Sequence, residues 1–222
     1  MNKKDINIVL ALLLIGLGFY FFKLPKPAEV KPDVVFDPTN ATYIIDGNPV
    51  TLVNGRAEVS AAPGSASTVQ TMIFGRPMIG DLNKDGVQDA ALLLVQDPGG
   101  SGTFYYIAAA LNEGNVAKGT NAILLGDRIA PQTLELRNGQ VIVNYAIRKP
   151  GEPMSTQPSQ GVSKYFNVEN GVLVEGKPIA GIGERCGGNM LNAPVCITGA
   201  RCAPSAGSHL PFGDVGGVCV AN

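Results

Sequence analysis

The sequence predicts a mainly β protein with an N-terminal transmembrane helix, an antiparallel β domain of the meander or sandwich type, and a small disulfide-stapled C-terminal module. The 222 residues include 28 Gly and 16 Pro, so turns must be frequent and helices after the N-terminus short. Short β-favouring runs alternate with Asn-Gly and Asp-Gly turn signals. An apolar run opens the chain, and all four cysteines lie near its end. We expect an anchor at 1–23, a Pro/Lys-rich stalk at 24–40, the β domain at 41–178 and a cysteine-rich module at 179–222.

The first apolar run, residues 6–22, predicts a membrane anchor. As a helix it would extend roughly 25 Å, close to the roughly 30 Å of a hydrocarbon core. Lys3, Lys4 and Lys23 flank it and can reach the two membrane surfaces. A cleaved signal peptide is the alternative, but the following FYFFKLPKP lacks the small residues that precede a cleavage site. No cysteine lies near the end of the run for lipid attachment, and a type IV pilin is a weaker alternative because the usual glutamate is missing.

Cysteine usage predicts which side of the membrane the domain occupies. Lysines lie on both sides of the apolar run, so charge does not decide the orientation. An even, clustered set of cysteines is typical of an oxidising compartment. We therefore expect a single-pass protein with a cytoplasmic N-terminus and its bulk in the periplasm or outside the cell. The proline-rich stretch 24–40 is expected to be a semi-extended stalk.

Turn signals divide the β domain into hairpins. Asp46-Gly47 and Asn54-Gly55 predict a small meander at its start, and Asn170-Gly171 predicts the last hairpin. A two-residue turn at Asn138-Gly139 would connect two strands of period-2 pattern. This turn would pair Leu136 with Val141 and Leu134 with Val143 on one face, leaving Glu135 and Arg137 on the other.

Two further runs predict strands. Residues 103–111, TFYYIAAAL, predict a more buried strand. The run DAALLLVQD at 89–97 could also be helical, since Ala and Leu favour helices. Its short length and turn-rich flanks favour a strand.

The segment GDLNKDGVQDAALLL at 80–94 predicts a calcium loop. Counted from Asp81, it reads D-x-N-x-D-G-x-x-D, with a glycine at the sharp turn. Calcium takes six to eight oxygens, which a curled loop can supply from alternate residues. The expected ligands are the side chains of Asp81, Asn83, Asp85 and Asp89 and the carbonyl of Val87. The alternative is a solvated acidic turn without an ion, although carboxylates so close together repel one another. We expect the loop to bind a structural Ca²⁺ with a dissociation constant of about 10⁻⁴ to 10⁻³ M.

Position 12 of this loop separates it from an EF-hand, because Leu92 stands where a bidentate glutamate is needed. The segment resembles the calcium loops of FG-GAP repeats in integrin-type β-propellers, and the resemblance supports the same ligand set. Only one such repeat is found, so a propeller is not expected. Residues 41–174 also resemble uncharacterised bacterial envelope proteins with a GDLNGDG-type segment, which implies an extracytoplasmic β domain.

The cysteines follow the pattern C-x9-C-x5-C-x16-C, formed by Cys186, Cys196, Cys202 and Cys219. Zinc sites usually contain closer pairs, so two disulfides are the simpler interpretation, with three pairings open. The CITGARC segment partly resembles small secreted cysteine-rich modules, some of which are protease inhibitors or receptor ligands. The simpler interpretation is a stapled tail that docks on the β domain or presents a surface loop.

The expected function is binding or scaffolding rather than catalysis. His209 is the sole histidine, no Ser/His/Asp set can be assembled, and the glycine-rich DPGGSG lacks the lysine and helix of a phosphate loop. The expected partners are the membrane and another envelope or extracellular protein. With 17 basic against 18 acidic residues and no Trp, nucleic acid is not expected. The alternatives are a protease inhibitor or receptor ligand carried by the cysteine segment, and a hydrolase using carboxylates near Asp81 or Asp127.

Overall fold

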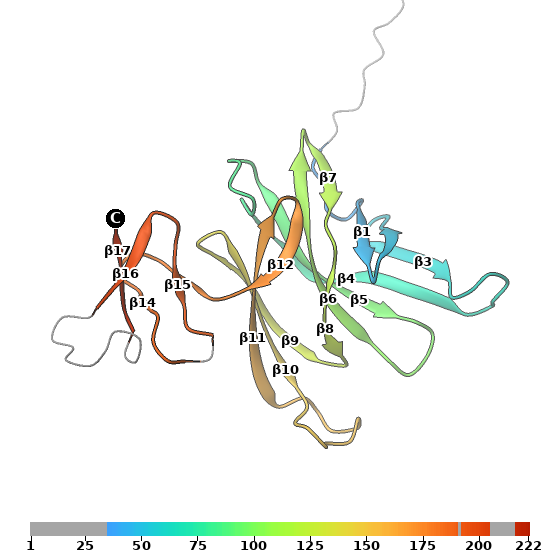
Figure 1. The fold of residues 1–222 in the computed structure, drawn as a ribbon. Coiled ribbons are helices and arrows are strands. Elements are labelled where there is room, and N and C mark those ends of the chain that lie inside the picture. The colour runs from blue at the N-terminus through green and yellow to red at the C-terminus, as the bar shows by residue number, and fades with distance from the viewer. Residues whose placement is uncertain (1–34, 191, 205–215) are drawn as a thin grey trace, which may run out of the picture. The chain divides into compact units, whose positions relative to one another are not determined.

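A computed structural model describes residues 35–190, 192–204 and 216–222. The expected transmembrane helix and most of the stalk lie outside these ranges. In the part of the chain that is described, no helix is both long and apolar enough to cross a bilayer. The described residues fold into β-strands that pair antiparallel, apart from one short parallel pair (Figure 1). The prediction of a mainly β protein with antiparallel sheets is confirmed.

The strands of the β domain are β1 (Thr42–Ile45), β2 (Asn48–Thr51), β3 (Arg56–Ser60), β4 (Thr68–Gly80), β5 (Asp89–Asp97), β6 (Phe104–Glu113), β7 (Val116–Gly119), β8 (Ile123–Asp127), β9 (Ala130–Arg137), β10 (Gln140–Ile147), β11 (Gln160–Glu169) and β12 (Val172–Gly176). A six-stranded sheet has the order β3-β4-β5-β6-β7, with β8 also paired to β6. A four-stranded sheet has the order β12-β11-β10-β9, and β1 and β2 form a separate hairpin.

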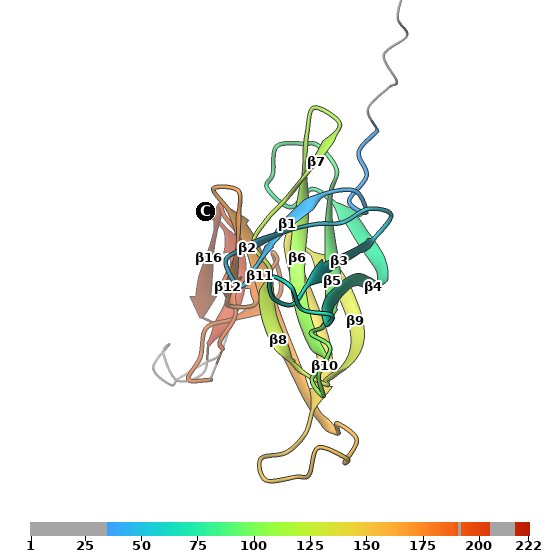
Figure 2. The ribbon, with the colours of Figure 1, turned by 90° about the vertical axis from the view of Figure 1, so that its right-hand side faces the viewer.

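Strands β5 and β6 are buried on both faces, which explains their nearly continuous apolar sequences. Successive side chains of a strand point to opposite faces. On one face Leu93 and Ile107 pack with Val143 and other residues of the four-stranded sheet. On the opposite face Leu92 and neighbouring residues pack with Tyr43 and other residues of the β1–β2 hairpin. In Figure 2 this hairpin crosses over β6, so the six-stranded sheet is the middle of three layers.

The hairpin predicted around Asn138-Gly139 is confirmed in its turn and its register. Both residues have positive φ, 54° and 72°, as a type I′ turn requires. Leu136 is paired with Val141 and Leu134 with Val143. The two valines are buried, and Glu135 and Arg137 are exposed on the other face. The hairpin of β11 and β12 turns at Asn170-Gly171 as predicted.

The strands predicted at 89–97 and 103–111 are confirmed as well. The run DAALLLVQD, for which a helix was the alternative, is strand β5 and has the predicted bounds Asp89–Asp97. The predicted strand at 103–111 is β6. Tertiary burial on both faces therefore outweighs the helical preference of Ala and Leu in β5.

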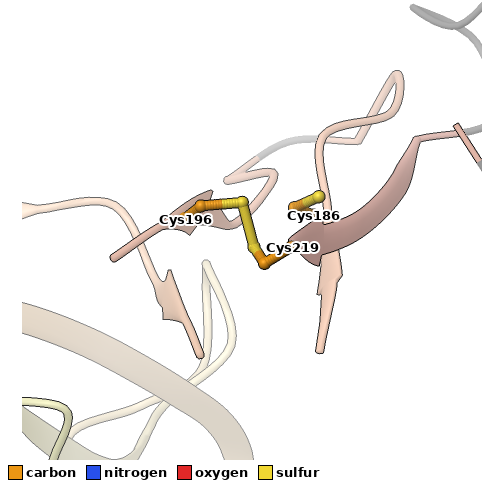
Figure 3. A group of neighbouring side chains, drawn as sticks. All are labelled: Cys186, Cys196 and Cys219. Atoms are coloured by element: carbon orange, nitrogen blue, oxygen red, sulfur yellow. A yellow bond between two sulfur atoms is a disulfide. The ribbon is translucent and has the colours of Figure 1, made fainter. Parts of the chain in front are cut away.

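The C-terminal residues form small sheets held by disulfides. Their strands are β13 (Ile179–Ala180), β14 (Arg185–Cys186), β15 (Val195–Cys196), β16 (Ala200–Pro204) and β17 (Gly217–Ala221). β13 pairs with β15 in parallel, and β17 lies between β14 and β16. Cys186 is bonded to Cys202 and Cys196 to Cys219, which selects one of the three pairings. Figure 3 shows the bond between Cys196 and Cys219. The buried core of this module consists of Ala180 and the cysteines, so disulfides replace a larger apolar core.

Candidate functional site

The acidic loop, residues 81–88, joins β4 to β5 at one end of the six-stranded sheet. Gly80 and Asp89, which flank the loop, are paired across the two strands. The loop must therefore leave and re-enter the sheet at neighbouring points, and its chain is forced into a closed curve.

The acidic and amide side chains fold this loop by binding its own backbone. The two carboxylate oxygens of Asp81 accept hydrogen bonds from the N–H groups of Lys84, at 2.7 Å, and Gly86, at 3.1 Å. The side-chain oxygen of Asn83 accepts from the Asp85 N–H at 3.0 Å, and the Asn83 amide donates to Asp85 at 2.9 Å. Lys84 and Gly86 have positive φ, 66° and 85°, which lets the chain curl around these side chains.

Two more of the predicted ligands lie at the C-terminal end of the loop. The other carboxylate oxygen of Asp85 accepts a hydrogen bond from the N–H of Val87, at 2.7 Å. The Val87 side chain is 42% exposed, so this end of the loop faces solvent.

Asp89 differs from the other predicted ligands because it is completely buried. Its two oxygens accept hydrogen bonds from the N–H of Leu82, at 3.0 Å, and the N–H of Asn112, at 2.9 Å. A buried carboxylate needs such partners, and bonds to an ionised acceptor are among the stronger ones. Asp89 therefore ties the start of the loop to the end of β6.

The donor chemistry of the loop suits a hard cation, because carboxylate and amide oxygens are the ligands that calcium prefers. Each carboxylate oxygen has a second lone pair beyond the hydrogen bond described above. In the described ranges, however, Asp81, Asp85 and Asp89 do not form a group whose oxygens all lie within 4.8 Å of one another. The structure thus gathers Asp81, Asn83 and Asp85 around the turn and holds Asp89 at its base by separate bonds.

Three cysteine sulfurs, those of Cys186, Cys196 and Cys219, do lie within 4.8 Å of one another. Figure 3 shows the bond between Cys196 and Cys219 with the Cys186 sulfur beside it. All cysteines of the chain are in disulfides. Metal ligation requires thiolates, so this cluster is a structural core in its oxidised form.

Asp127, the other carboxylate considered for catalysis, lies at the opposite end of the sheet from the acidic loop. Through β6 it is aligned with Gln96 near the end of β5, whereas Asp89 begins that strand. At about 3.3 Å per residue the two ends are roughly 23 Å apart. Arg128 donates to the Asp127 carboxylate from Nη2 at 2.8 Å, and this hydrogen bond lowers the pKa of the carboxyl below its usual range. Asp81 and Asp127 are therefore too far apart to act together on one bond of a substrate.

Gln140 is a buried polar residue that sequence reasoning missed. Its side chain is 1% exposed and lies where β10 meets the start of the cysteine-rich module. Its amide nitrogen donates to the Lys177 carbonyl at 2.8 Å and to Asn167 at 3.1 Å, and its oxygen accepts from the Ile179 N–H at 2.9 Å. A polar residue directly after an Asn-Gly turn is ordinary in an exposed hairpin, so the sequence contains no signal for this role.

Asn121 makes a similar connection between the sheets. Its side chain donates to the Leu173 carbonyl at 3.0 Å and accepts from the Leu173 N–H at 2.8 Å. It thus satisfies both backbone groups of one residue of β12, as a neighbouring strand would.

Comparisons of the chain with protein-family models, with curated proteins and with solved structures found no match.

Proposed function

We propose that this protein is a membrane-anchored binding or scaffolding protein of an extracytoplasmic space, braced by a structural Ca²⁺ in the acidic loop. The proposed ligands are the side chains of Asp81, Asn83, Asp85 and Asp89 and the carbonyl of Val87. The proposed anchor is the apolar run at residues 6–22. The partner is another envelope or extracellular protein.

The observation that carries the calcium proposal is the closed curve of the acidic loop. Asp81 and Asn83 already turn their oxygens toward the loop's own N–H groups, so the curl that an ion needs does not have to be created on binding. A bound cation would also offset the repulsion between the carboxylates. Asp89 would need to bind the ion while its oxygens still accept hydrogen bonds from the N–H groups of Leu82 and Asn112.

Two further observations support the proposed extracytoplasmic location and the proposed binding role. Both disulfides suit an oxidising compartment and would be reduced in most cytosols. Asp127, engaged by Arg128, lies at the other end of the sheet from Asp81. Among the described residues, these two carboxylates are therefore too far apart to serve as acid and base on a shared substrate.

Calcium titration of the full chain in detergent tests the metal. We expect thermal unfolding to shift upward by about 3–6 °C when free Ca²⁺ exceeds the dissociation constant about tenfold. D85A should abolish the shift, because it removes a proposed ligand. Asp85 is exposed, so the sheets on either side of the loop should stay folded. The matched control is E58A, which removes an exposed carboxylate from β3. An unchanged midpoint at about 10 mM Ca²⁺, tenfold above the weaker expected dissociation constant, contradicts the metal site.

Protease treatment of spheroplasts tests the location. We expect added protease to degrade the β domain while a cytoplasmic marker protein stays intact. A variant lacking residues 1–23 should no longer fractionate with membranes. Protection of the β domain in sealed spheroplasts would place it in the cytoplasm and contradict the proposal.

Affinity capture tests the binding role. We expect the full chain to retain a defined envelope or extracellular protein, identified by mass spectrometry and then verified by direct binding of the two purified proteins. If no retained protein binds the purified chain directly, the scaffolding role is contradicted, whatever the calcium titration shows.

A further inference from the structure

A cleft of about 530 Å³ lies where the acidic loop, the β9–β10 turn and the cysteine-rich module meet. Its volume is in the range of about 300–1,000 Å³ that small-molecule sites occupy. Such sites combine apolar walls with a few polar groups. The side chains that matter here are Ile179, Val195, Ile197, Lys84, Asn138 and Thr198.

The apolar wall of the cleft comes from the parallel pair of β13 and β15. Ile179 and Val195 are direct partners in this pair, and Ile197 follows one residue after β15 ends. Val195 is 46% exposed, so part of this wall faces water. An apolar group that entered the cleft would remove this surface from water, which is favourable.

The walls are held in place independently of any ligand. Gln140 accepts a hydrogen bond from the Ile179 N–H, and the disulfide between Cys196 and Cys219 joins β15 to β17. The Ile197 N–H donates to the Ala180 carbonyl at 2.9 Å. A site that is already ordered costs less conformational entropy on binding.

Among the described residues that line the cleft, Lys84 is the one with a charged side chain. Its Cε lies 3.3 Å from the position that a Cβ on Gly139 would occupy, so its stem lies against the β9–β10 turn. In the described structure no carboxylate lies within ion-pair distance of its ammonium. Asn138 and Thr198 add an amide and a hydroxyl donor at the same cleft.

We propose that this cleft binds a small amphipathic carboxylate, with the anionic end at Lys84 and the apolar part against Ile179, Val195 and Ile197. A single ammonium balances the one negative charge of a carboxylate, whereas it would leave part of the charge of a doubly ionised phosphate uncompensated. The neutral donors of Asn138 and Thr198 can serve the second carboxylate oxygen. This inference goes beyond the proposed function and does not require calcium.

Methyl NMR of the full chain in lipid nanodiscs tests this site, with hexanoate as the probe and EDTA present. EDTA makes the result independent of the calcium proposal. We expect hexanoate to shift the methyl signals of Ile179, Val195 and Ile197 in a saturable way. Val59 and Val116 are exposed valines outside the cleft, and their signals should not move. Hexan-1-ol should bind more weakly, and hexylammonium should leave the cleft signals unchanged.

Substitution of Lys84 distinguishes a built site from general partitioning. K84M keeps the length of the stem and removes the charge, and it should weaken hexanoate binding about fivefold. K84R should retain binding, and K149M, at an exposed lysine elsewhere, should behave as the wild type. Equal affinity of K84M and wild type, equal affinity for hexan-1-ol and hexanoate, or equal shifts at Val59 and Val116 would each overturn the proposal.

Discussion

The side-chain oxygen of Gln140 accepts a hydrogen bond from the backbone N–H of Ile179 at 2.9 Å. Through this bond and a second one to the Lys177 carbonyl, β10 holds the chain where it leaves the β domain for the cysteine-rich module. The side chain is almost fully buried, so water cannot replace these partners. One amide therefore fixes the beginning of a module whose own core contains little besides disulfides.

Replacing Gln140 by alanine should destabilise the protein by about 2–4 kcal/mol, because buried backbone groups lose their partners and a cavity is left. Urea unfolding measures the loss, and amide exchange at Ile179 should accelerate. The control is Q132A on the exposed part of β9, which should change stability little. Exchange at Ile179 as slow in Q140A as in the wild type would show that the amide does not hold the module.

The hairpins could be predicted because their signals are local. The Asn138-Gly139 turn and the period-2 pattern beside it fix both the turn type and the register within a few residues. The same local reasoning found β5, since its short apolar run is bounded by turns. Local reasoning could not select the cysteine pairing, since pairing depends on how distant segments meet. It could not find the role of Gln140 either, because its partner Ile179 is 39 residues away along the chain.

Asp89 shows the same limit within the candidate site. Its spacing from Asp81 predicts a calcium ligand, and the structure adds that both its oxygens already accept backbone hydrogen bonds. One of these donors, Asn112, is 23 residues distant and reaches the loop only because β6 pairs with β5. The sequence pattern thus identifies the loop, and the sheet pairing determines what each carboxylate contacts.

A methyl group at Gly119 should destabilise the contact between β7 and β1. An added Cβ would lie 2.2 Å from the Thr42 carbonyl oxygen, and backbone cannot move away as a flexible side chain can. We expect G119A to lower the free energy of unfolding by about 1–3 kcal/mol in a urea titration. G161A is the control, since nothing lies within 4 Å of its new Cβ, and it should be neutral or slightly stabilising. Equal stability of the two variants would contradict the close approach.

Asp127 should contribute to a loss of stability in acid. The Arg128 hydrogen bond lowers the pKa of this carboxyl in the folded state below the ordinary value of 3.8. The unfolded chain therefore takes up the proton first as pH falls. The stabilisation is present above the ordinary pKa and is lost as pH falls through the lowered pKa of the folded state.

D127N should accordingly lose less unfolding free energy than the wild type between about pH 5 and pH 2. Urea titrations across this range measure the difference. D97N is the control, because Asp97 forms no ion pair in the described structure. Parallel pH profiles of D127N and wild type would show that Asp127 has no part in the acid response.

The disulfide pairing makes a sharp test of the C-terminal module. Cys202 and Cys219 are direct partners across β16 and β17, yet each is bonded to a different cysteine, Cys186 and Cys196. Peptide mapping without reduction should recover only the Cys186–Cys202 and Cys196–Cys219 pairs. Replacing both cysteines of either pair by serine should lower the free energy of unfolding by about 2–4 kcal/mol, because each bond closes a loop in the unfolded chain. Recovery of a Cys202–Cys219 peptide would contradict the pairing of Cys186 with Cys202 and of Cys196 with Cys219.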